Sequence, residues 1–480
     1  MPKRTLRRAI EGYRRDEARA RVGRWRGEAS AESEQEVLSG YAWLARDEGL
    51  ERLAEAEEEG SLGADEARAM RAQLADLHAE RVLGQTRAAW RALPARVLER
   101  DGHRVPCGDL VEAVAAPDAR ANRSLRAAGV RALEQVAADV APRIRDRQAQ
   151  ASAARAAVLG AAVPDAGSPV ALAHAWLAAS DDLAQEALAR GASCEGLPHP
   201  ERWEQLAALL SFTGLRGRFG ERDRARRVGA LFGALGLGRE LSFVRIEPPH
   251  PSVGGRARLA VLDPTRDVRV SPSRRELGLA SELALTEGVG RALGQLLAPA
   301  ALPFVQRVPV VDHGPRALAA LIMQVPFDPA AQQGGRALAR ERPHLAAAGV
   351  SLLALPMRVA AASVVARAEG TRDATVALAQ RATGVPLPPA LAQLLLAGEV
   401  APPARFLAGL RSLVFWPRLR DAHDEDWFRN PRAAETLRAS LAVAAASDGA
   451  ADVHLPGLWE RALVDDDVPV ARARMQELLG

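Results

Sequence analysis

The chain has 480 residues, of which 48% are hydrophobic. A chain of this length and composition can bury a large core and favours two lobes. Its 64 basic and 60 acidic residues leave a formal net charge of only +4, which does not indicate a nucleic-acid-binding protein. Two cysteines, Cys107 and Cys194, are too few for a disulfide framework or a cysteine metal site, and favour a cytoplasmic protein with reduced thiols.

The first 27 residues form the one strongly basic segment, with ten basic side chains against three acidic ones. Leu6, Ile10 and Tyr13 recur at helical spacing and predict an amphipathic helix. Such helices contact RNA or anionic membranes in some proteins, but a solvated first helix of a helical lobe is the better interpretation. No apolar stretch typical of a signal peptide follows, and no run approaches the length of a membrane span.

The first 200 residues are expected to form an N-terminal helical lobe. A short hairpin is predicted near 97–105, because Asp101-Gly102 is a favoured tight-turn pair. Residues 194–200 read as a loop, which puts the end of this lobe at about residue 200. The helical patterns cover about 31–59, 64–92, 118–159, 170–190 and 201–212.

Residues 201–480 are expected to form a second lobe. Three short β-like runs at 242–270 are separated by glycines and prolines, which predicts a small sheet. The chain is helical again from about residue 275. The expected helices are 275–297, 315–324, 334–347, 349–368, 371–382, 388–397, 403–418, 431–446 and 456–479.

The segment Thr286-Glu287-Gly288-Val289-Gly290 lies within the apolar helical pattern of 275–297. Its spacing is that of His-Glu-x-x-His, in which two histidines on one helix face bind Zn²⁺ and the Glu activates a water molecule. Thr286 and Gly290 stand at the two ligand positions, and only Glu287 is retained. Neither replacement offers a nitrogen or sulfur atom to a metal.

Together with segments on both sides, this motif resembles the bacterial oligopeptidases of the thimet-oligopeptidase and oligoendopeptidase family. The resemblance implies a mostly α, two-lobed, gluzincin-peptidase-like fold with a small β-sheet and a central cleft, in which 201–480 is a degenerate catalytic lobe. The segments that carry it follow one another in order: Glu99–Pro106, Ala116–Arg120, Phe304–Arg307, Asp312–Leu318, Arg381–Val385 and Glu425–Pro431.

Members of this family take a third zinc ligand from a Glu on a second helix, and the resemblance places Arg316 at that position. A guanidinium group has no acceptor and stays positive, so it repels Zn²⁺. No Glu lies between Glu287 and Glu341, so a shifted alignment does not supply the ligand. We expect Arg316 to approach Glu287 as its counter-charge in place of zinc; the alternative is two surface charges that never meet.

The family also polarises the scissile carbonyl with tyrosine hydroxyls from its C-terminal region. Both tyrosines of this chain precede residue 42, and Phe406 stands where the resemblance places one of the family's. His250 and His313 are expected to line the cleft. A metal site rebuilt from them with Glu287 is a weaker interpretation than loop or capping histidines.

The sequence therefore predicts a catalytically inactive oligopeptidase-like protein, with Glu287 as a vestigial general base and without a metal or cofactor. It is expected to be cytoplasmic and to bind a peptide or protein partner in its cleft, with neither nucleic acid nor membrane as a partner. Two alternatives stay open. One is an active cytoplasmic zinc oligopeptidase, and the other is a structural subunit whose cleft is filled by side chains.

Overall fold

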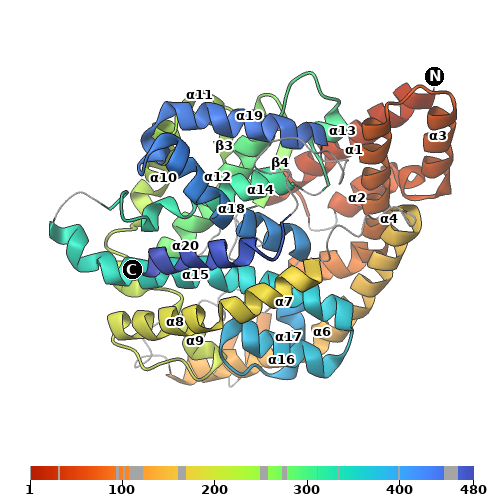
Figure 1. Ribbon diagram of the computed structural model, residues 1–480. Coiled ribbons are helices and arrows are strands. Elements are labelled where there is room, and N and C mark those ends of the chain that lie inside the picture. The colour runs from red at the N-terminus through yellow and green to blue at the C-terminus, as the bar shows by residue number, and fades with distance from the viewer. Residues whose placement is uncertain are drawn as a thin grey trace.

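The computed structural model describes residues 2–30, 33–92, 97–100, 103–106, 123–159, 169–248, 258–272, 278–310, 312–332, 336–397, 401–447 and 463–480. These residues are mostly helical and include a small three-stranded sheet, as the sequence predicts (Figure 1). The chain begins with α1 (Pro2–Trp25), α2 (Ser33–Gly40), α3 (Asp47–Glu58), α4 (Ala64–Ala92), the antiparallel strands β1 (Val97–Arg100) and β2 (His103–Pro106), and α6 (Arg123–Leu159).

The middle of the chain holds α7 (Pro169–Ala179), α8 (Asp181–Glu195), α9 (Trp203–Leu209), α10 (Arg224–Ala234), α11 (Gly238–Leu241), β3 (Val244–Ile246), β4 (Arg258–Asp263) and β5 (Asp267–Ser271). The helices that follow are α12 (Leu279–Leu296), α13 (Phe304–Arg307), α14 (His313–Ile322), α15 (Arg336–Glu369), α16 (Arg372–Thr383), α17 (Pro389–Ala397), α18 (Pro402–His423), α19 (Pro431–Ser447) and α20 (Asp467–Leu479).

The segment expected to be one helix over 31–59 is broken into α2, a 3₁₀ turn at Ala42–Ala45, and α3. The break is tight, because a Cβ at Gly49 would lie only 2.8 Å from the carbonyl oxygen of Leu44. Glycine alone permits this approach of the helix start to the preceding turn.

Two helices expected at 334–347 and 349–368 form a single one, α15, with Pro343 and Pro356 inside it. Gly349 lies within the helix, where the ring of Phe327 packs against its backbone. A Cβ at this position would overlap that ring, so only glycine fits there. The expectation that no run approaches a membrane span is wrong: in the described part of the chain, Glu341–Glu369 is long and apolar enough. However, 78% of its apolar window is buried inside the protein, as in the core helix of a globular fold.

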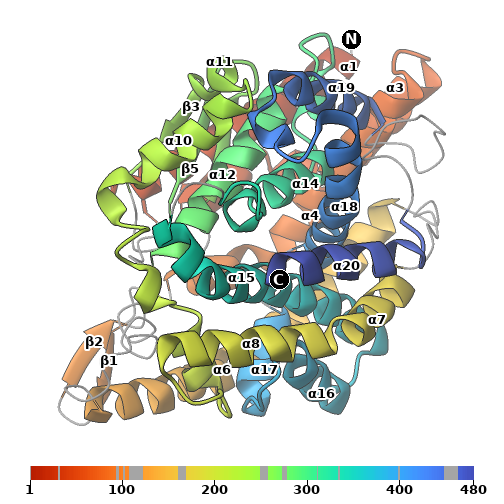
Figure 2. The same ribbon diagram turned by 60° about the vertical axis from the view of Figure 1, so that its left-hand side comes forward.

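Helix α15 lies between two groups of helices, with α7, α8 and α16 on one side and α18 and α20 on the other (Figures 1 and 2). The first core cluster surrounds it and contains Trp176, Phe406 and Leu478. This cluster includes residues on both sides of the boundary expected near residue 200, from Leu172 to Leu479.

The small sheet has the order β3-β5-β4, with β3 parallel and β4 antiparallel to the central β5. Val268 and Val270 on β5 are fully buried in a second core cluster formed mainly with α12, α14, α18 and α19. Helix α1 packs against β4 and thereby joins the N-terminal helices to the sheet.

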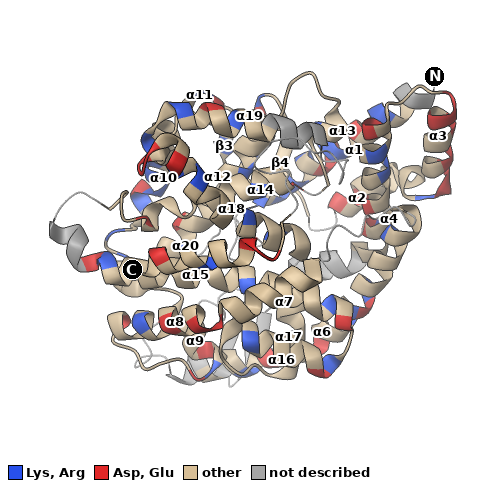
Figure 3. Cartoon of the chain, in the orientation of Figure 1, with Lys and Arg blue, Asp and Glu red and all other residues tan. Residues whose placement is uncertain are grey.

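Basic and acidic residues are interspersed over the helices (Figure 3). In the basic first helix, Leu6, Ile10 and Tyr13 are buried against α3 and α4, as expected for a helix of a helical lobe. Several of its arginines pair with carboxylates; Arg24, for example, lies 2.9 Å from Glu34.

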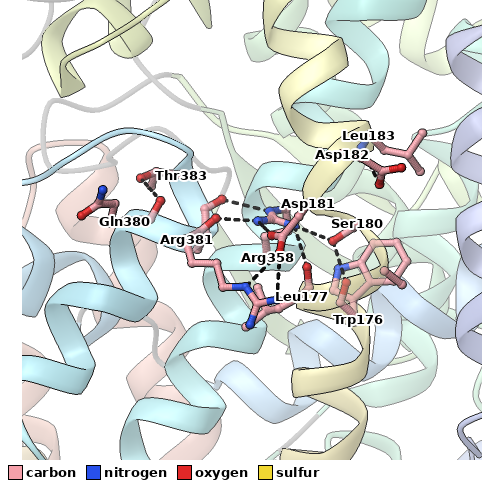
Figure 4. Close-up of polar contacts among 12 residues, drawn as sticks. Trp176, Leu177, Ser180, Asp181, Asp182, Leu183, Arg358, Gln380, Arg381 and Thr383 are labelled. Carbon is pink, nitrogen blue, oxygen red and sulfur yellow. Dashed lines mark hydrogen bonds and ion pairs between the residues drawn. The ribbon is translucent and has the colours of Figure 1, made fainter.

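Arg358 on α15 is almost fully buried, and its side chain is hydrogen-bonded to residues at the ends of neighbouring helices (Figure 4). It donates hydrogen bonds at the C-terminal ends of α7 and α16, where carbonyl groups have no partner within their own helix. Its acceptors are the carbonyl oxygens of Leu177, Arg381 and Ala382, Ser180 Oγ and Asp181 Oδ1.

Candidate functional site

The Thr-Glu-x-x-Gly motif lies on α12, as predicted, on a helix that is buried along most of its length. Thr286 is 1% exposed, and its hydroxyl donates a hydrogen bond to the carbonyl oxygen of Glu282 at 2.9 Å. The side chain at the first ligand position is therefore bonded to its own helix. Glu282 is paired in turn with Arg227 on α10.

At the second ligand position, α12 comes into backbone contact with α14. A Cβ at Gly290 would lie 2.7 Å from the Cα atom and 3.0 Å from the Cβ atom of Ala319. One turn later, a Cβ at Gly294 would lie 2.5 Å from the Cα atom of Pro315. Since real side chains do not approach this closely, position 290 has no room for an imidazole ring.

Arg316, at the expected third ligand position, lies on α14. Its Nε atom is 2.5 Å from Asp312 Oδ1, and Arg291 Nε on α12 is 2.8 Å from Asp312 Oδ2. Burial raises the pKa of Asp312, but the two guanidinium groups outweigh this effect and lower it to about 2. The ionised carboxylate of Asp312 thus links α12 to the start of α14.

Glu287 and Arg316 line the same small cavity of about 70 Å³, whose other walls are largely apolar and include Met323 and Met357. Glu287 is half-buried, and within the described ranges it has no ion pair. The expected pairing of Arg316 with Glu287 is not observed among the described residues, because the carboxylate that Arg316 contacts is that of Asp312.

His313 and Phe406, two of the three residues expected to line the cleft, lie in different parts of the fold, and the third, His250, is not among the described residues. His313 begins α14 beside Asp312; burial and, next, the Arg411 charge lower its pKa to about 4, so the ring is neutral at physiological pH. Phe406 is fully buried in the core around α15 instead of lining a cleft, because its apolar ring packs among other apolar side chains there.

A larger cavity of about 380 Å³ is lined by residues of α1, α4, α6, β4, α12, α14, α15 and α17. Arg316 lines both the small and the large cavity, so α14 borders both of them. This cavity is the candidate for the central cleft that the sequence predicts.

The residues at the ligand positions do not fit a zinc ion. The Thr286 hydroxyl is engaged by its helix, Gly290 has neither side chain nor space, and Arg316 is positive. In the described part of the chain, no group of three or more His, Cys, Asp or Glu side chains is placed to hold a metal ion.

The sequence reasoning missed the cluster of Arg291, Asp312 and Arg316. Asp312 and Arg316 are four residues apart, which is the spacing of an ion pair on one helix face and the signal that indicates half of the cluster. The link to Arg291 has no local signal, because it depends on the packing of two helices.

No protein-family model matches this sequence, and no curated protein matches it in sequence. Solved structures similar to it in fold include the following three. A protein assigned as oligoendopeptidase F from Bacillus anthracis strain Ames has a TM-score of 0.56 and 12% identity over 88% of this chain and 79% of that one. PZ peptidase A, solved with an inhibitor, has a TM-score of 0.58 and 11% identity over 88% and 81% of the two chains.

A second structure assigned as oligoendopeptidase F has a TM-score of 0.57 and 12% identity over 92% of this chain and 83% of that one. At such low identity the likeness concerns the fold and not the chemistry. The chain therefore has the mostly helical fold of the oligoendopeptidases.

Proposed function

We propose that this chain is a catalytically inactive oligopeptidase-like protein, which binds a peptide or protein partner in the large cavity. The observation that carries the proposal is the contact of Gly290 with Ala319, where a Cβ would come within 2.7 Å of a backbone atom. A histidine ligand at this position requires the two helices to move apart. The residues at the other two ligand positions also support an inactive protein, since Thr286 is bonded to its own helix and Arg316 is positively charged.

Loss of the metal ligands does not remove the space in which such proteins hold peptides. The cavity of about 380 Å³ is within the size range of ligand-binding pockets. Its size favours a binding protein over a structural subunit with a filled cleft. A cytoplasmic location is part of the proposal, because only two cysteines occur in the chain.

Metal analysis and peptide hydrolysis test the inactive state. Protein purified in the presence of zinc is expected to carry far less than one zinc ion per chain and to leave a library of quenched fluorescent peptides intact. The Glu287→Gln variant is the matched control, because an authentic activity needs this carboxylate and a contaminating peptidase does not. One chelatable zinc ion per chain, with hydrolysis that Glu287→Gln abolishes, establishes the active zinc oligopeptidase instead.

Binding is tested separately on the same preparation. A peptide library screened by fluorescence anisotropy is expected to contain ligands that saturate at one site per chain. If neither peptides nor cell proteins bind the full chain, the binding part of the proposal is wrong.

A further inference from the structure

Gln295 is the one side chain in the described lining of the large cavity that has a buried polar atom without a partner. It lies on α12, one turn after Arg291, and is 3% exposed. Its Oε1 atom accepts no hydrogen bond from the described residues. Buried polar groups in folded proteins are nearly always hydrogen-bonded, because an unbonded one costs stability. A ligand in the cavity that Gln295 borders would provide the missing partner.

A second glutamine next to this cavity shows how a buried carboxamide is bonded when it serves the fold. Gln73 on α4 is 1% exposed, and both ends of its carboxamide are used. Its Oε1 atom accepts from Arg14 Nε at 2.7 Å, and its Nε2 atom donates to the carbonyl oxygen of Val308 at 2.7 Å. Gln73 thus links α4 to α1 and to the segment after α13, whereas Gln295 makes no such link among the described residues.

The charged side chains of the described lining all have interaction partners. Asp312 accepts from Arg291 and Arg316, for example, and Asp76 accepts from Arg14 at 2.8 Å. An ionic ligand would have to compete with these partners for the same groups. A neutral ligand that bonds to Gln295 leaves them in place.

The chemistry of a carboxamide selects the kind of neutral ligand. It has a donor and an acceptor side by side, and its last side-chain torsion is soft, so it can turn toward a ligand. In an extended peptide, the N–H and C=O groups of one residue point the same way and match both ends. A carboxylate or phosphate offers only acceptors and an ammonium group only donors. The lining also has apolar side chains that suit those of a peptide: Ile144, Leu259, Val261, Val308 and Val310.

We infer that Gln295 binds the backbone of a neutral peptide in this cavity, while side chains of the peptide contact the apolar part of the lining. The inference rests on the proposed function and specifies its ligand and one residue that binds it. A hydrogen bond to the backbone does not depend on the sequence of the peptide. The apolar lining therefore provides the selectivity.

Gln295→Met tests this role, because it removes the carboxamide and keeps an unbranched side chain. In the free protein it replaces an unbonded polar group by an apolar one, so the urea midpoint of the full chain is expected to stay or to rise. The control is Gln332→Met. Gln332 is 8% exposed, is not among the described lining residues, and donates to the carbonyl oxygen of Pro326 at 3.2 Å. Loss of this hydrogen bond is expected to lower the midpoint.

The probes are two fluorescein-labelled hexapeptides with the same side chains, in which Val alternates with Ser. One has ordinary amide bonds, and in the other esters replace the amides, so that its backbone has no N–H group. The wild type is expected to bind the amide probe about tenfold more tightly than the ester probe. Gln295→Met is expected to weaken the amide probe about tenfold and to bind both probes alike. Gln332→Met is expected to change neither affinity.

Unchanged binding of the amide probe by Gln295→Met overturns the inference. A urea midpoint that falls as far in Gln295→Met as in Gln332→Met also overturns it, since the carboxamide then serves the fold. Equal affinity of the wild type for the two probes shows that the peptide backbone is not recognised. If neither probe binds, the inference is wrong, while the library screen decides the proposed function independently.

Discussion

The contact between α12 and α14 makes a quantitative prediction for Gly290→Ala. The added Cβ would lie 2.7 Å from the Cα atom of Ala319, whereas carbon atoms in contact are about 3.5–4.0 Å apart. The helices must therefore separate by roughly 1 Å, and overpacking of this kind costs about 1–3 kcal/mol. Alanine regains up to about 1 kcal/mol of helix propensity. We expect a net loss of about 1–2 kcal/mol in the free energy of unfolding.

The assay is urea unfolding followed by far-UV circular dichroism, which gives the midpoint and the slope for each variant. The matched control is Gly233→Ala on α10, because nothing lies within 4 Å of the Cβ position there. The same substitution should stabilise the protein at position 233, by up to about 1 kcal/mol. If Gly290→Ala stabilises the protein as much as Gly233→Ala does, the helices are not in contact, and the argument against a histidine ligand is refuted.

Two further predictions concern buried charges. Arg358→Met should cost about 3–5 kcal/mol, because it leaves helix-end carbonyls without donors, whereas Arg381→Met, at an exposed pair with Asp181, should cost at most about 1 kcal/mol; equal losses in urea unfolding would contradict this. Folding lowers the pKa of His313 from 6.5 to about 4, so the contribution of this residue to stability is complete above pH 6.5 and falls by up to about 3 kcal/mol as the pH is lowered to 4. In His313→Asn this part of the pH dependence should disappear; an unchanged unfolding profile between pH 7 and 4 would show that His313 does not cause it.

Elements with a local signal were predictable from the sequence. The helix of Glu287, the three short strands and the hairpin of β1 and β2 follow from periodicity and from glycine and proline positions. The continuity of α15 was not predictable, because prolines at 343 and 356 and the glycine at 349 normally indicate breaks. Tertiary packing around this helix outweighs its local preferences.

The candidate site was predictable only in part. The sequence identifies which residues stand at the ligand positions, but not that Gly290 and Ala319 are in contact, since their closeness depends on the crossing of two helices. For the same reason it names Glu287 as the carboxylate that Arg316 approaches, whereas the carboxylate in contact with Arg316 is that of Asp312. Shared ion pairs between distant segments, such as Asp76 with Arg14 and Arg155, leave no trace in local spacing.

The glycine contact between α12 and α14 also bears on how such a chain evolves. A mutation that restores histidine at position 290 first meets the backbone of Ala319, and it confers no metal affinity while Thr286 and Arg316 are in place. A histidine at position 290 alone therefore costs stability without completing a set of metal ligands, and proteins tolerate only a few kcal/mol of such loss. The contact with Ala319 thus makes the absence of a side chain at position 290 a requirement of this packing, whatever the chemistry of the site.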